Sequence, residues 1–193
     1  VEGRLWVEKA LDISRNMRSK LMEGMCVAML ARIEIREGNY LEAYEHATEA
    51  ISVLKKSESG MTFKGPSMLV IIACTTNDAD ERRAALGKAE SMLSEGSVGH
   101  NHLDFYEDVM EGSLRMAEWD EVDRYAQALE DYTRPEPLPR SEFFIARGRA
   151  LAAHGRGNRD QANMAELQRL HDEAENIGLK IALPALEAAL ASS

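Results

Sequence analysis

The sequence has 193 residues, of which 45% are hydrophobic and 29% are charged, and its formal net charge is −10. This balance is typical of a folded domain and argues against a disordered chain. The acidic excess argues against nucleic-acid binding, because a phosphate backbone is held by clustered lysines and arginines. The longest apolar run, residues 68–76, falls far short of the roughly 18 residues that a membrane helix needs. We therefore expect no membrane contact and a cytoplasmic location.

No segment has the order of charged, apolar and small residues that marks a signal peptide. The start at Val1, without a methionine, suggests a fragment of a longer protein. Cys26 and Cys74 lie among apolar residues and outside any metal-ligand spacing. We expect both to be buried free thiols in a reducing compartment.

Apolar residues recur at spacings of three and four along most of the chain, which predicts amphipathic helices. Trp6 and Trp119 fall on this spacing and are expected to pack in the core or between helix pairs. Residues 60–67 are predicted to be a loop that enters the fourth helix. In chain order, the ten predicted helices span residues 2–17, 19–37, 40–57, 66–76, 79–94, 101–116, 119–132, 140–154, 158–177 and 179–191.

Residues 131–140 are the clearest break in this pattern. They contain Pro135, Pro137 and Pro139, which disfavour helix and favour an extended, polyproline-like segment. The segment is predicted to be a stiff connector between helix pairs, with a docking ligand for another domain as the alternative.

A turn signal repeats along the chain at intervals of 39, 40 and 40 residues, at Gly38, Asn77, Ala117 and Gly157. Glycine and asparagine easily adopt the left-handed conformation that ends many helices, and Ala117 is the weak member of the series. Self-similarity at 20 to 50 residues is typical of a solenoid. The sequence therefore predicts an all-α fold of about four to five helix pairs with a period of about 40 residues, forming one domain over residues 1–193.

The first full copy of this repeat resembles the tetratricopeptide family. The segment LARIEIREGNYLEAYEHATEAI (residues 30–51) has small residues at Ala31, Ala43 and Ala50, with Gly38 and Tyr40 at the turn. The 40-residue period exceeds the 34 residues usual in that family. It is more similar to the longer repeats of bacterial signalling ATPases and maltose-type transcription activators. The resemblance implies an α-α superhelix whose first helices line a groove for a protein or peptide.

The C-terminal half resembles the tail of multidomain bacterial class III adenylate/guanylate cyclases. The similar segments are HNHLDFYEDVMEGSLRMAEWDEVDRYAQALEDYTRPEPLPRSEFFIARGRALAAHGRG (residues 100–157) and IALPALEAAL (residues 181–190). The resemblance implies that any cyclase domain lies elsewhere in a parent protein. This part of the chain would then be a regulatory tail.

Three features that could carry chemistry are better explained without it. Residues 60–67 (GMTFKGPS) lack the Lys-Ser/Thr that follows a phosphate-binding loop. His100 and His102 are two residues apart, so on a helix they point to different sides, and Asn101 is expected to cap the helix there. Acid pairs such as Glu107 with Glu111 suit a solvated or partner-binding face better than general acid–base catalysis. We expect no metal, no cofactor and no catalytic activity.

Residues 94–131 contain eleven acidic residues and only two arginines, Arg115 and Arg124. We call this segment the acidic band. Our hypothesis is that Asp104, Glu107 and Glu111 are exposed in the groove and receive a basic segment from a partner or from other domains of the parent chain; a solvated outer face is the alternative. Offsets from the turn markers predict a groove formed by Arg32, Arg36, Ile71, Asp104, Glu107, Glu111, Arg115 and Arg147, with Lys64 beside them.

Together these patterns predict a non-catalytic protein–protein interaction or regulatory module of a bacterial signalling protein. The alternative is a small-molecule sensor domain, as in maltose-type regulators. A closed cavity lined by aromatic residues would favour the sensor, and only 6% of the residues are aromatic. The pattern does not predict an oligomeric state.

Overall fold

The computed structural model describes residues 2–192, and these residues form helices and no strand. The all-α prediction is confirmed, and each predicted helix has its counterpart. The helices are α1 (Glu2–Asn16), α2 (Lys20–Glu37), α3 (Tyr40–Leu54), α4 (Gly60–Thr75), α5 (Ala79–Ser94), α6 (Gly99–Arg115), α7 (Trp119–Thr133), α8 (Pro139–Gly155), α9 (Gln161–Asn176), the short 3₁₀ helix η1 (Lys180–Ala182) and α10 (Leu183–Ala191).

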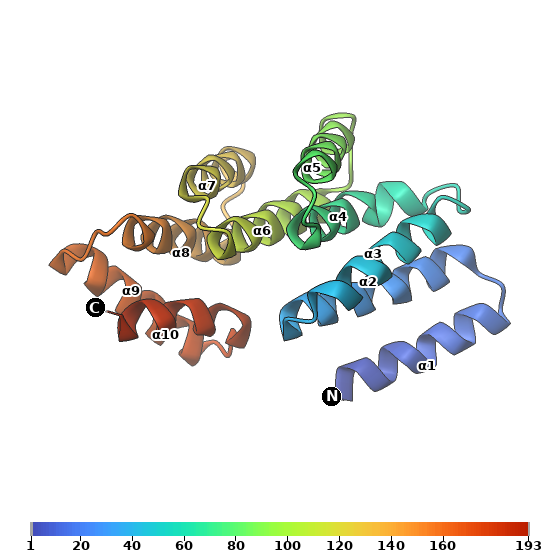
Figure 1. The fold of residues 1–193 in the computed structure, drawn as a ribbon, viewed down its shortest axis with the longest axis horizontal. Coiled ribbons are helices and arrows are strands. Elements are labelled where there is room, and N and C mark those ends of the chain that lie inside the picture. The colour runs from blue at the N-terminus through green and yellow to red at the C-terminus, as the bar shows by residue number, and fades with distance from the viewer. Residues whose placement is uncertain (1, 193) are drawn as a thin grey trace. The chain divides into compact units, whose positions relative to one another are not determined.

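The chain divides into two compact units (Figure 1). Unit 1 is Val1–Phe105, which holds α1 to α5 and the first residues of α6. Unit 2 is Tyr106–Ser193, which holds the rest of α6 and all later helices. The units are described separately below, and the prediction of one domain over the whole chain stays a prediction.

The core of unit 1 depends on a close approach between α2 and α3, which lie side by side as a hairpin (Figure 1). Ala43, Ala47 and Ala50 are fully buried on one stripe of α3. A Cβ atom at Gly24 of α2 would lie 2.6 Å from the Leu54 side chain, so only glycine fits there. Ala43 and Ala50, named above as small residues of the repeat, thus lie on this buried stripe. It lets the two backbones pack closely, and larger side chains there would force them apart.

The chain turns at all four predicted markers, but not by the same device. Gly38, Ala117 and Gly157 have positive φ angles of 82°, 56° and 95°, the left-handed conformation that stops a helix. Asn77 does not: α4 ends because Thr76 is extended, with φ −71° and ψ 146°. Ala117 accepts the strain of a positive φ although it lacks the freedom of glycine. The sequence reasoning ranked these two residues in the opposite order.

The fourth helix begins at Gly60, so the prediction of a loop over residues 60–67 is wrong. Pro66 lies inside α4 and has no N–H to donate to the carbonyl of Thr62, four residues earlier. The buried side chain of Asn101 donates to that carbonyl instead, with Nδ2 2.6 Å from the oxygen. Asn101 is the third residue of α6 and not its cap. It supplies the hydrogen bond that Pro66 removes, which is why the helix tolerates a proline.

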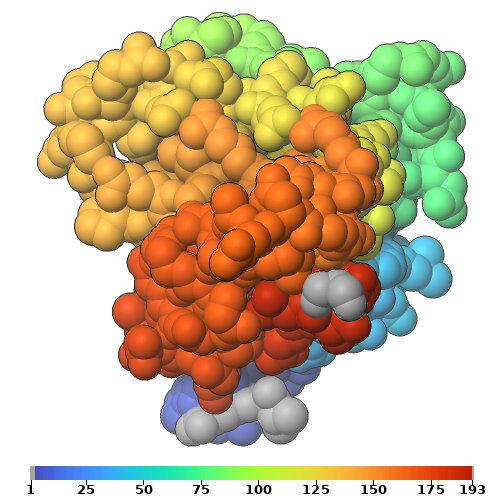
Figure 2. All heavy atoms as spheres, turned by 90° about the vertical axis from the view of Figure 1, so that its left-hand side faces the viewer, coloured from blue at the N-terminus to red at the C-terminus, as the bar shows by residue number. Residues whose placement is uncertain are grey.

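Unit 2 is packed around apolar residues of α6, α7 and α8. Gly148 of α8 allows close contact with Met110 and Val122, which would lie 3.3 Å from an added Cβ. Gly155 faces the Trp119 ring, 2.6 Å from such a Cβ, so Trp119 packs between helices as predicted. Pro139, expected to prevent helix, is instead the first residue of α8, a position where its missing N–H costs nothing. Figure 2 shows α9 and α10 of this unit, in orange and red, packed against each other.

Candidate interaction surface

In unit 1, helix α2 has a buried face and a solvent-facing one. The buried face contains Val27, Ala28 and Ala31. On the opposite face, Met22 and Met29 are 53% and 47% exposed, and Arg36 is exposed at the same seven-residue interval. Residues seven apart lie almost directly above one another on a helix. Helix α2 thus presents an aligned row of flexible apolar side chains that ends in an arginine.

A charged cluster borders this row and joins three helices of unit 1. Asp104, near the start of α6, accepts from Arg32 of α2 at 2.7 Å and from Lys64 of α4 at 3.1 Å. Burial alone would raise the pKa of Asp104, but the two cations lower it below its ordinary value. The cluster holds two positive charges and one negative charge. Repeat offset predicted that all three residues lie in the groove, and the structure brings them together.

We call the surface formed by Met22, Met29, Arg32, Arg36, Lys64 and Asp104 the methionine face. It combines accessible apolar area with an excess of cations. The sequence reasoning found its charged members but missed Met22 and Met29. The spacing of 22, 29 and 36 was the available signal, since it continues one line along the helix.

In unit 2, the acidic residues predicted to face a partner are bound within the chain. Glu107 is buried and accepts two hydrogen bonds from Arg140, at 2.9 and 2.7 Å. Glu111 pairs with Arg147, which is only 1% exposed. Arg147 also donates from Nε to the carbonyl of Ala182, at 3.0 Å. The expectation that Glu107 is exposed is therefore wrong, and Arg147 is an interior residue. The cations of α8 supply the positive charge that these carboxylates attract.

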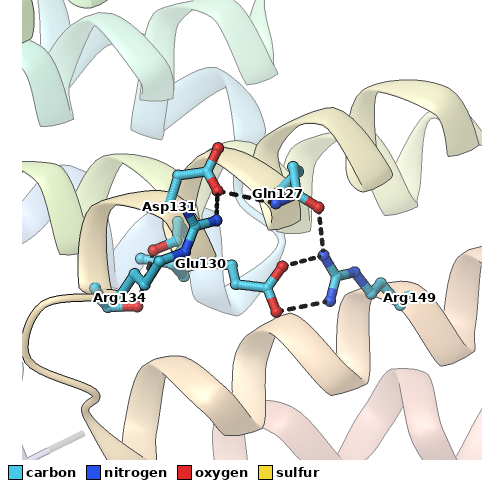
Figure 3. A network of polar contacts seen from close by, with 7 residues as sticks. Gln127, Glu130, Asp131, Arg134 and Arg149 are labelled. Atoms are coloured by element: carbon cyan, nitrogen blue, oxygen red, sulfur yellow. Dashed lines mark hydrogen bonds and ion pairs between the residues drawn. The ribbon is translucent and has the colours of Figure 1, made fainter.

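The same explanation extends along the acidic band. At least eight of its eleven carboxylates make ion pairs, mostly with cations that lie outside residues 94–131. Figure 3 shows one group in unit 2, where Arg149 of α8 binds Glu130 and Gln127 of α7. Arg156 similarly binds Asp120 and Asp123, at 2.7 and 2.8 Å. Opposite charges on neighbouring helices offset the repulsion within the band.

The other predicted groove residues differ in accessibility. Arg36 and Arg115 are exposed at the ends of α2 and α6. Ile71 is only 1% exposed and belongs to the core of unit 1, because α4 is apolar on nearly every side. Offset from a turn marker locates a residue along a helix. It does not say whether a neighbouring helix covers that residue.

The remaining candidates for chemistry show structural contacts. His100 lies beside Phe63, with ring centroids 6.3 Å apart, and burial lowers the pKa of His102. Within residues 2–192, no group of three or more His, Cys, Asp or Glu side chains is arranged to hold a metal ion. Cys26 and Cys74 are not joined in a disulfide; Cys74 is buried and Cys26 is half-buried. None of the helices in this range combines the length and apolar character needed to cross a membrane.

The chain matches no protein-family model, and it has no match among curated proteins or solved structures. A functional assignment therefore depends on the geometry described above and on the resemblances in the sequence.

Proposed function

We propose that the protein is a non-catalytic helical-repeat module that binds a segment of another protein. In this proposal the helix pairs α2–α3, α4–α5, α6–α7 and α8–α9 are successive repeats of a tetratricopeptide-like solenoid. Support comes from the turns near residues 38, 77, 117 and 157 and from the alanine stripe between α2 and α3. The first helix of each pair would contribute to the binding surface.

The methionine face is the observation that carries this proposal. Methionine side chains adapt to irregular apolar partners, and they are common on surfaces that bind amphipathic helices. Arg32, Arg36 and Lys64 add positive charge at the edge. The matching partner is an amphipathic segment with apolar anchors and flanking carboxylates. In this cluster two cations, Arg32 and Lys64, share the single carboxylate of Asp104, so a carboxylate of the partner would compete for them.

The wider context of this proposal is a regulatory role in a bacterial signalling protein of the adenylate/guanylate cyclase kind. That context is supported only by the sequence resemblance of residues 100–157 and 181–190. The partner segment could then belong to another domain of the same parent protein.

The test is a pull-down from the source cells with the double variant Met22→Lys/Met29→Lys. Both side chains are exposed, so the variant should fold, and any captured partner should bind at least about tenfold more weakly. The matched control is Leu41→Lys, an apolar residue on α3 that is 67% exposed. Retention of the same partners by the double variant at unchanged affinity would refute the assignment of the methionine face.

A further inference from the structure

Helix α1 carries two apolar faces, and α2 covers only one of them. The covered face contains Val7, Leu11 and Ser14; Leu11 and Ser14 are buried. The second face is formed by Trp6, Ala10, Ile13 and Met17, at intervals of four, three and four residues. Three of these side chains are among the most exposed apolar groups of the described chain, with Trp6 at 61%, Ile13 at 59% and Met17 at 73%. The prediction that Trp6 packs in the core or between helix pairs is therefore wrong.

The repeat shows what this second face corresponds to. A shift of 40 residues places α1 on α3, with Trp6 on His46, Ala10 on Ala50 and Ile13 on Val53. In α3 these positions are covered: Ala50 is fully buried and Val53 is 7% exposed. The same position of the repeat is thus buried in one helix and open to solvent in the other.

Contacts in unit 1 identify the helix that covers these positions in α3. His46 lies 4.0 Å from Glu34 of α2, so this side of α3 faces α2. Helix α3 packs against both α2 and α4, whereas α1 packs against α2 in the way that α3 packs against α4. The open face of α1 is therefore equivalent to the face with which α3 holds α2.

We infer that Trp6, Ala10, Ile13 and Met17 are a docking face for a partner helix that lies antiparallel to α1, as α2 lies along α3. The partner should present a stripe of small apolar residues, as α2 does with Val27, Ala28 and Ala31, and no charge opposite the Trp6 indole. This inference rests on the repeat of the proposed function. It involves no residue of the methionine face, so either surface can fail its test while the other passes.

The test keeps the full chain and places a copy of residues 20–40 directly before Val1. This addition preserves the 40-residue register, with the copied glycine at the turn. The Glu34 position of the copy is changed to alanine so that no carboxylate is buried against Trp6. Trp119→Phe leaves Trp6 as the only tryptophan. We expect the Trp6 emission to shift to shorter wavelength, its quenching by acrylamide to fall severalfold, and the melting temperature of unit 1 to rise.

Two substitutions on α1 make the test specific. Ile13→Asp should abolish these changes in the extended chain and have little effect on the chain without the extension, where Ile13 is exposed. Leu5→Asp is the matched control, because Leu5 is 49% exposed on another side of α1 and should leave the changes intact. The inference is overturned if Trp6 stays equally open to acrylamide in the extended chain. It is also overturned if Trp6 of the original chain becomes protected as its concentration rises, since the occupant would then be a second copy.

Discussion

Unit 1 and unit 2 each pair an arginine with a carboxylate of another helix, but they bury the two arginines to different degrees. In unit 1, Arg32 meets Asp104 at a half-buried site beside the exposed Met22 and Met29. In unit 2, Arg147 is enclosed among α6, α8 and η1, where Glu111 and the Ala182 carbonyl bind it. An arginine that is enclosed within the fold cannot bind a partner. An arginine at a half-buried edge can exchange its carboxylate within the chain for a carboxylate of a partner. Our proposal therefore places partner binding in unit 1, whereas Arg147 of unit 2 joins helices of its own unit.

The largest expected effect that tests this comparison is the loss of the buried arginine. Arg147→Ala should lower the free energy of unfolding of unit 2 by about 3 to 5 kcal/mol, because the Ala182 carbonyl and Glu111 lose their partner and a cavity remains. Arg32→Ala, the matched change in unit 1, should cost less, about 1 to 2 kcal/mol, because Lys64 stays paired with the half-buried Asp104. Urea unfolding monitored by Trp119 fluorescence measures the cost of Arg147→Ala. Urea unfolding monitored by circular dichroism measures the costs of both changes. Equal costs would remove the distinction between the units.

A second prediction concerns the proline inside α4 of unit 1. Asn101→Ala should cost about 1 to 3 kcal/mol, since it leaves the Thr62 carbonyl with only a long hydrogen bond from Ser97, at 3.4 Å, in place of the Pro66 N–H. In the Pro66→Ala background the backbone donor is restored, so the same change should cost clearly less. The measurement is a double-mutant cycle of unfolding free energies. Additive costs would show that Asn101 does not compensate for Pro66.

These contacts also show how far the sequence could predict the structure. The helix order and the turns followed from apolar spacing and from residues such as Gly38, because both are local properties. The Pro66–Asn101 compensation could not be predicted, because it joins positions 35 residues apart through a side chain. Burial of Ile71 and Arg147 was missed for a similar reason: exposure depends on which other helix lies opposite. Repeat offset did select Arg32, Lys64 and Asp104, which the structure joins by ion pairs across α2, α4 and α6.

A third prediction uses pH to examine a buried carboxylate of unit 1. A hydrogen bond from Arg4 lowers the pKa of Glu34 to about 2, against burial, and Asn39 adds a further bond at 2.8 Å. The Glu34 carboxylate therefore binds a proton less readily in the folded state than in the unfolded state, where its pKa is near 4.5. The stabilisation is complete above that value and is lost as the pH falls from about 4.5 to about 2.

The matched variant for this prediction is Glu34→Gln. It should be less stable than the original chain by about 2 kcal/mol at neutral pH, and the difference should shrink towards zero at pH 2. Urea unfolding of both chains at several pH values measures this difference in stability. Other carboxylates that titrate in the same range are present in both chains, so their contribution cancels. A difference that stays constant with pH would mean that Glu34 stabilises by packing and not by its charge.

The smallest effect is expected from the surface network of unit 2 in Figure 3. Arg149 donates to Glu130 at 2.8 Å and to Gln127 at 3.0 Å, and it keeps the pKa of Glu130 below its ordinary value. Both charged side chains are more than a third exposed, so water and salt screen the pair. Arg149→Ala should therefore have the smallest cost of these changes, and that cost should fall further in 1 M NaCl. Arg147→Ala on the same helix should keep most of its cost at that salt concentration. Because the two arginines are two residues apart and differ mainly in burial, parallel urea curves at low and high salt separate burial from charge. A cost for Arg149→Ala as large and as salt-resistant as that for Arg147→Ala would show that the exposed network also holds α7 to α8.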